Sequence, residues 1–167
     1  MPELKNLDDL FVHTLRRVYD AEQRLTKALP KMAEAAEAQE LKQAFQTHVK
    51  ETETHIDRID RLFGMFNRTP NADTDDALKG IVKASEDVID LDAGNSVKDA
   101  ALVAAAQEAE HYEIAVYGTL RTWARVLAKP EAVQLLERTL EEEKRADQKL
   151  TAIAGSLNSQ AAAVGAR

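Results

Sequence analysis

Four long segments of the sequence place apolar side chains on one helical face, and each of these apolar faces contains carboxylates. The segments run from Asn6 to Met32, Leu41 to Phe66, Ser96 to Leu127 and Pro130 to Gly155. Their apolar residues recur at intervals of three and four, which is typical of amphipathic helices. A single chain can bury four such faces only by packing the helices against one another. The pattern therefore predicts an all-α helical bundle.

The links between the segments predict how the helices are connected. The first two segments are close in sequence, and so are the last two, with Pro130 suited to the first turn of its helix. The pairs are separated by the polar stretch NRTPNADTDD, a short amphipathic piece from Leu78 to Ile89 and a break at Gly94. Two antiparallel hairpins joined by one long crossover form a ferritin-like four-helix bundle. We expect this fold, with a short extra helix in the crossover.

Individual residues predict where the helices begin and where they are interrupted. Asn6 is a plausible N-cap for the first helix, and Ser96 for the third, where Asp99 would complete a capping box. Pro30 is expected to kink or break the first helix, because proline lacks the backbone donor that a helix interior needs.

The chain is long enough for one domain. Its 167 residues, of which 44% are hydrophobic, can bury one sizeable core and are too few to suggest two. No capped periodic pattern follows Gly155. We therefore expect one bundle domain over residues 1–157 and a flexible tail over residues 158–167.

Charge and cysteine content exclude several classes of function. Acidic residues outnumber basic residues 29 to 22, so neither nucleic acid nor an anionic membrane is an expected partner. The absence of cysteine excludes disulfides, thiolate catalysis and cysteine-bound metal clusters. The stretch MPELKNLDDL does not resemble a secretory signal, and no apolar run approaches bilayer length. The expectation is a soluble cytoplasmic protein.

The carboxylates lie near the midpoint of each predicted helix, and midpoints of antiparallel helices lie side by side. Any one of these residues alone would be interpreted as the solvated flank of a helix, but a matched depth in all four favours a shared site. The convergent residues are Glu22 in the first helix, Glu51 with His55 in the second, Glu110 and Glu113 in the third, and Glu143 with Asp147 in the fourth. The choice between Glu110 and Glu113 as the inward residue stays open.

Such a cluster would destabilise the fold unless its charge were neutralised. Buried ions cost several kcal/mol, and like charges raise one another's pKa. Two divalent cations would remove most of the repulsion, and oxygen-rich ligation with one imidazole suits iron or manganese better than zinc. His55 is the strongest individual candidate, since it follows Glu51 by one turn on the apolar face. We expect two iron ions, with manganese as the alternative.

Other polar residues near the predicted site have less definite roles. His48 lies two turns before His55 and is expected beside the ligands or at the edge of the core. His111 is expected to be exposed or to form an oligomer contact. Tyr117 is expected to be a core tyrosine bonded to a buried carboxylate. Glu142, beside Glu143, is expected on a solvated face.

Three stretches resemble a known family. YDAEQRLTKALPKMA, AAQEAEHYEIAVYGTLRTWA and LERTLEEEKRADQKL are similar to the YciF and YciE group of bacterial stress-associated proteins, within the rubrerythrin and ferritin superfamily. The resemblance covers the chain from about Asp8 to Leu157. It implies a four-helix bundle with a dinuclear metal site, a homodimer and a link to stress responses. The ligands it implies are Glu22, Glu51, His55, Glu110 with Glu113, Glu143 and Asp147.

The sequence departs from the superfamily pattern of glutamate followed three residues later by histidine. Thr54 and Ala146 occupy those positions, and the potential ligands lie one residue further on, at His55 and Asp147. The leading hypothesis is a non-haem dinuclear metalloprotein that reacts with Fe(II) and dioxygen, or with peroxide. As an enzyme it would be a di-iron oxidoreductase of ferroxidase or peroxidase type, with no catalytic residue assigned. The alternative is a non-catalytic dimeric structural or interaction protein stabilised by metal.

Overall fold

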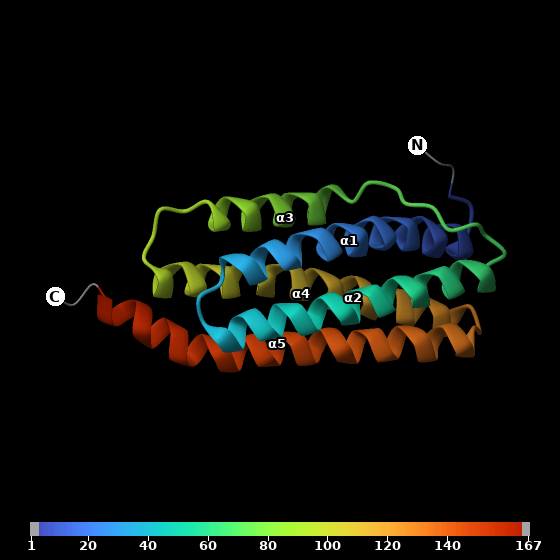
Figure 1. The fold of residues 1–167 in the computed structure, drawn as a ribbon. Helices are drawn as coiled ribbons and strands as arrows, with labels where there is room; N and C mark the ends of the chain where they lie inside the picture. The colour runs from blue at the N-terminus through green and yellow to red at the C-terminus, as the bar shows by residue number, and fades with distance from the viewer. Residues whose placement is uncertain (1–3, 165–167) are drawn as a thin grey trace.

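The fold is a bundle of four long helices with a fifth, shorter helix packed on its side (Figure 1). The computed structural model describes residues 4–164, and this part of the chain contains no strand. The helices are α1 (Leu7–Ala35), α2 (Gln39–Met65), α3 (Asp76–Ile89), α4 (Asn95–Val126) and α5 (Pro130–Val164). The predicted all-α ferritin-like bundle with a helix in its crossover is confirmed.

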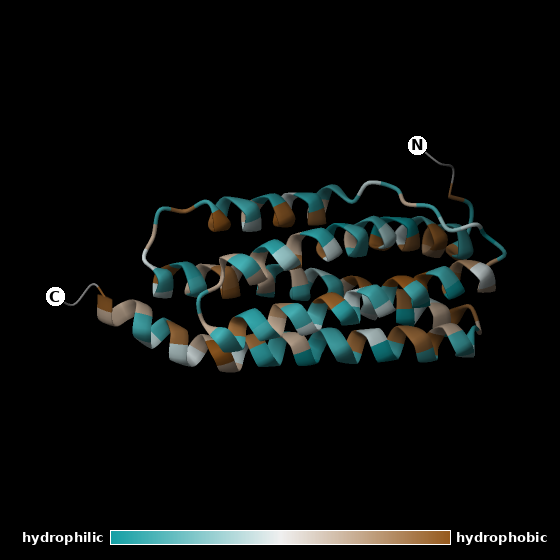
Figure 2. Cartoon of the chain, in the orientation of Figure 1, coloured by the Kyte–Doolittle hydropathy of each residue, from teal (hydrophilic) through white to brown (hydrophobic). Residues whose placement is uncertain are grey.

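Two helical hairpins form the bundle, and the crossover connects them along its length (Figure 1). Residues 36–38 join α1 to α2, and residues 127–129 join α4 to α5. In the crossover, α3 packs on α1 and α4 and turns its apolar side toward them (Figure 2). Leu78 of α3 is fully buried, a contribution of about 1.5–3 kcal/mol for a leucine. Among residues 4–164, no helix has the apolar length required to span a membrane.

Near its ends, α1 confirms the expected N-cap and excludes a break at Pro30, one of the two expectations for this proline. The Asn6 side chain accepts a hydrogen bond of 2.8 Å from the Asp9 backbone, as expected of an N-cap. Pro30 does not break the helix, which continues to Ala35. A proline removes one bond of the helical ladder, whereas burial of Leu29 and Met32 beside it keeps this segment packed in the core.

The capping box expected at the start of α4 is wrong. Gly94 is the N-cap of α4 and provides no side chain. The Asp99 carboxylate instead accepts hydrogen bonds of 2.9 Å from the Glu37 backbone and 2.8 Å from the Ala38 backbone. These donors precede α2, whose own N-cap, Ala38, cannot bond them through its side chain. Asp99 therefore ties the α1–α2 turn to α4.

The last helix is longer than the sequence pattern indicates. It passes through Gly155 and ends at Val164, with Ile153 and Leu157 buried against the core. These two residues lie four positions apart on one helical face, which holds the helix beyond the glycine. Most of the predicted tail is thus helical, while residues 165–167 lie outside the described residues.

Two apolar clusters fill the interior and lie at different levels of the bundle. The first includes Leu25, Phe45 and Leu150, and the second includes Val18, Ile59 and Leu140. Near the level where the clusters meet, each long helix has buried polar residues: Glu22 in α1, His48, Thr52 and His55 in α2, Glu110 and Glu113 in α4, and Glu143 in α5. The core therefore contains a polar layer across all four long helices.

Candidate metal centre

Six ionisable side chains converge in the polar layer. All are buried, with at most 5% of each residue exposed. They are Glu22 from α1, His48 and His55 from α2, Glu110 and Glu113 from α4, and Glu143 from α5. A buried carboxylate is rare without a partner, and four together indicate a shared counter-charge.

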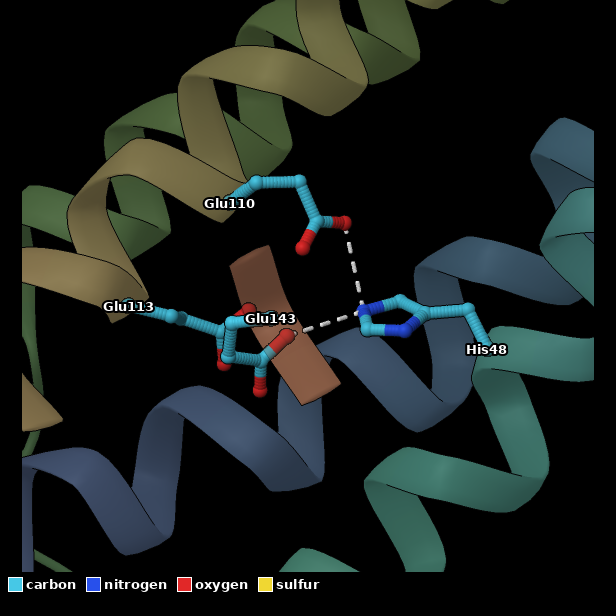
Figure 3. A group of neighbouring side chains, drawn as sticks. All are labelled: His48, Glu110, Glu113 and Glu143. Carbon is cyan, nitrogen blue, oxygen red and sulfur yellow. Dashed lines mark ion pairs between the residues drawn. The ribbon is translucent and has the colours of Figure 1, made fainter. Parts of the chain in front are cut away.

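The first of two groups contains His48, Glu110, Glu113 and Glu143 (Figure 3). His48 Nε2 lies 3.2 Å from Glu110 Oε1 and 3.6 Å from Glu143 Oε2. One potential ligand atom from each of the four residues lies within 4.8 Å of the others. These atoms come from three helices, so a cation among them would join α2, α4 and α5.

The second group contains Glu22, His55 and Glu143. His55 Nδ1 lies 3.4 Å from Glu22 Oε1 and 2.9 Å from Glu143 Oε1. Glu143 therefore belongs to both groups, with Oε2 toward His48 and Oε1 toward His55. A carboxylate placed in this way can bridge two cations.

Side chains next to the two groups form further contacts with the two histidines and with Glu22. His48 Nδ1 lies 3.3 Å from Glu51 Oε2, and His55 Nε2 lies 3.0 Å from Glu142 Oε2. The buried Tyr117 hydroxyl donates to Glu22 Oε1, which confirms the expected role of this tyrosine. Each imidazole thus has one nitrogen toward the buried carboxylates and the other toward an outer carboxylate.

The protonation of the cluster reflects competition between burial and charge. Burial lowers the pKa of His48, but the carboxylates of Glu110 and Glu51 outweigh it and raise the pKa to about 9. Burial raises the pKa of Glu110 and of Glu113 well above the usual range. Burial opposes ionisation of Glu143 as well, yet its neighbour His55 lowers the Glu143 pKa. Protons therefore supply the positive charge in the absence of a cation.

The donor atoms of the cluster fit a divalent metal ion. Among the described residues, seven of its buried atoms form no hydrogen bond of normal geometry: Glu22 Oε2, His55 Nδ1, Glu110 Oε2, both Glu113 oxygens and both Glu143 oxygens. His55 Nδ1 and Glu143 Oε1 are close, at 2.9 Å, but do not form such a bond. Buried polar atoms are normally satisfied, and those left unpaired require an explanation. Carboxylate oxygens with two imidazole nitrogens suit iron or manganese. Metal coordination would satisfy all seven atoms.

A pocket of about 140 Å³ between α2 and α5 reaches the first group. Buried His48 and Glu110 line its inner part, and exposed Thr47 and Lys149 line its outer part. A cavity of roughly 150 Å³ can hold a molecule the size of benzene. The pocket can therefore admit a small molecule to the His48 side of the cluster.

Five of the seven residues predicted as ligands lie in the cluster: Glu22, His55, Glu110, Glu113 and Glu143. Both glutamates of α4 face inward, which settles the alternative left open by the sequence. Glu51 and Asp147 do not lie in either group, which corrects the expected convergence. Thr52 is the inward residue between the two histidines, and a helix turns about 100° per residue, so Glu51 points outward with 36% of its side chain exposed.

Asp147 lies in the outer groove between α4 and α5. Gln107 Nε2 donates a 2.9 Å hydrogen bond to its carboxylate, and His111 Nε2 lies 3.3 Å from it. His111 itself is exposed, with 69% of its side chain accessible, as one of the two expectations for it stated. These contacts orient the Asp147 carboxylate away from the buried groups.

Two residues have more central positions than the sequence pattern indicates. His48 was expected beside the ligands, yet it lies within the first group. Its separation of seven residues from His55, two full turns, was the available signal. The expectation of a solvated Glu142 is wrong, because this side chain is only 18% exposed and pairs with Arg58 and His55. No periodic signal marks Glu142, since its partners lie on another helix.

Comparisons with known proteins assign the chain to a family. It is 45% identical over 152 residues to Protein YciF of Escherichia coli K12, covering 90% of this chain and 92% of that protein. The crystal structure of the E. coli stress protein YciF superposes with a TM-score of 0.90 at 43% identity, covering 93% and 99% of the two chains. YcfI of Rhodopseudomonas palustris, described as a candidate structural protein, gives 0.85 at 43% identity, covering 89% and 95%.

A family model also matches almost the entire chain, over residues 6–163. The matched region begins at the N-cap of α1 and ends within the last turn of α5, so it contains every residue of the cluster. The chain belongs to the family described as Domain of unknown function (DUF892), and it is a homologue of the stress protein YciF.

Proposed function

We propose that this protein is a ferritin-like dinuclear non-haem metalloprotein of the bacterial stress response, which binds two iron or two manganese ions. The observation that carries the proposal is the set of buried potential ligand atoms that form no hydrogen bond and are shared between two adjoining groups. His48, Glu110 and Glu113 would hold one ion, Glu22 and His55 the other, and Glu143 would bridge them. Retention of so many buried carboxylates is costly without such a role.

The proposed reaction is with Fe(II) and dioxygen, or with peroxide. Bound iron or manganese would supply the redox chemistry and polarise the bound oxidant. The pocket beside His48 provides access for a small oxidant, and the apolar clusters on both sides exclude bulk water. Tyr117 holds the Glu22 carboxylate in place through its hydroxyl.

Metal content of purified variants tests the site. Glu143→Ala should lose both ions, because this residue belongs to both groups. Glu141→Ala is the matched control on the same helix, since Glu141 is exposed and pairs with Lys144. Elemental analysis after anaerobic loading with Fe(II) or Mn(II) and dialysis should give two ions per chain for the control. Full retention of both ions by Glu143→Ala would contradict the proposed site.

A second candidate function is a non-catalytic structural protein whose metal ions hold the helices together. The relative YcfI, described as a candidate structural protein, favours this alternative. Oxygen and peroxide consumption by the Fe(II)-loaded protein separates the two functions. Turnover above that of the Glu143→Ala variant supports the oxidoreductase, whereas metal-dependent thermal stabilisation without turnover supports the structural role.

We also propose that the protein assembles as a homodimer, as its resemblance to the stress-protein family implies, and that it acts in the cytoplasm. Light scattering of the metal-loaded chain measures the assembly directly. A monomeric mass at micromolar concentration would refute the dimer without affecting the metal site.

A further inference from the structure

The two histidines of the candidate centre are held from outside by partners of very different rigidity. His48 contacts the outer carboxylate of Glu51 through Nδ1, and His55 contacts that of Glu142 through Nε2. Histidines that bind metal usually donate their second N–H to a carboxylate of this kind, which fixes the ring orientation. The rigidity of each outer carboxylate therefore determines how firmly its imidazole is placed.

Glu142 is fixed by a fork of hydrogen bonds from Arg58. Arg58 Nη2 donates to Glu142 Oε1 at 3.0 Å, and Nη1 donates to Oε2. Nη1 also donates at 3.0 Å to Thr139, which lies one turn before Glu142 on α5. The side chains of Arg58 and Glu142 are only 15% and 18% exposed. A bidentate pair with this burial restricts both partners, so His55 is held against a rigid support.

Glu51 has no comparable support. Its side chain is 36% exposed, and within residues 4–164 its contact with His48 is the one ion pair found for its carboxylate. It lines the 140 Å³ pocket together with His48, so both residues border the route between solvent and the first group. His48 can consequently move with its outer partner, and an ion held by it lies next to an exit.

We propose that the two halves of the centre are inequivalent, with a retained metal ion at His55 and an exchangeable ion at His48. Glu142 and Arg58 act as positioning residues for the retained ion, and Glu51 acts as the positioning residue for the exchangeable ion. The inference rests on the proposed function, since both halves require a metal ion. It adds an order of binding and release that the ligand set alone does not give.

Release of Mn(II) from the full-length loaded protein tests this order. Increasing concentrations of chelator should remove the two ions in two separate steps. Electron paramagnetic resonance of the released Mn(II) measures each step. Glu142→Ala should weaken the tightly held ion by about 10–100-fold and leave the other within twofold, as expected when an outer partner of a ligand is lost. Glu142→Gln, which keeps an acceptor for His55, should recover part of this affinity. Glu51→Ala should weaken the easily released ion alone.

Two further variants provide an independent test of the positioning contact and a control. Arg58→Lys keeps the charge but loses the fork, so it should shift the tight ion in the same direction even if Glu142→Ala folds poorly. Glu141→Ala, exposed on the same helix, should leave both steps unchanged. Release of both ions in one step, or equal weakening of both by Glu142→Ala, would overturn the inequivalence. Retention of no Mn(II) by the wild-type chain would instead refute the dinuclear centre itself.

Discussion

Tyr117 gives Glu22 its hydrogen bond inside the bundle, while the second Glu22 oxygen has no partner among the described residues. In the metal-free protein, Tyr117→Phe should therefore lower the free energy of unfolding by about 1–3 kcal/mol, because a buried acceptor is left unsatisfied. Urea denaturation in the presence of a chelator measures this loss. Tyr19→Phe is the control, since Tyr19 is only half-buried, packs edge-on against Phe63 and bonds Asp60 outside the cluster. An equal loss in both variants would contradict the special role of Tyr117.

At the same scale, the sequence predicted most of the site but not its exact members. Residues on the apolar stripe, such as Glu22 and Glu143, were found because helical periodicity fixes which way a side chain faces. Periodicity does not decide between adjacent residues near the edge of the stripe, and packing placed Thr52 inward and Glu51 outward. Glu142 was missed because its burial depends on Arg58 of α2, a partner that no local pattern reveals.

At the scale of the elements, the α1–α2 turn depends on a side chain from α4. Asp99→Ala would leave the Glu37 and Ala38 backbone donors without their charged acceptor. We expect a loss of about 2–3 kcal/mol in the free energy of unfolding, and a smaller loss for Asp99→Asn, which keeps one oxygen. Thermal and urea denaturation measure the difference. Asp92→Ala, in the exposed loop before α4, should change stability by less than about 0.5 kcal/mol.

The end of α4 contains a residue in an unfavourable conformation. Ala128 has a φ of 52°, and the Ala128 and Lys129 backbone donors bond back to Arg125 and Ala124 in the geometry of a Schellman motif. Glycine adopts this left-handed conformation without strain. Ala128→Gly should therefore raise the free energy of unfolding by about 0.5–1 kcal/mol. The same change at exposed Ala84 within α3 should lower it by about 1 kcal/mol, and a loss at both positions would refute the argument.

At the scale of the whole molecule, the bundle was predictable because its links are short within each hairpin and long between them. The length of α5 was not predictable, since the helix beyond Gly155 depends on Leu157 reaching the core rather than on a continuous pattern. The same core is divided by the polar layer, so the two apolar clusters meet across charged groups. Stability of the molecule should therefore depend on what neutralises that layer.

The metal-free protein should lose stability as pH rises from 6.5 toward 9. His48 has an unfolded pKa of 6.5 and a folded pKa of about 9, so its contribution is complete below 6.5 and is lost through 9. It is faced by Glu51 of α2, Glu110 of α4 and Glu143 of α5. The raised pKa of Glu113 acts in the same direction, because the folded state keeps a proton that the unfolded state releases.

Metal ions replace these protons, so stabilisation by Mn(II) should increase over the same pH range. Thermal unfolding at pH 6, 7.5 and 9, with chelator or with Mn(II), measures both trends. His48→Gln should flatten the pH dependence of the metal-free protein, because it removes the imidazole that titrates in this range. A metal-free protein whose stability increases between pH 6.5 and 9 would show that the buried carboxylates are not holding protons in place of a cation.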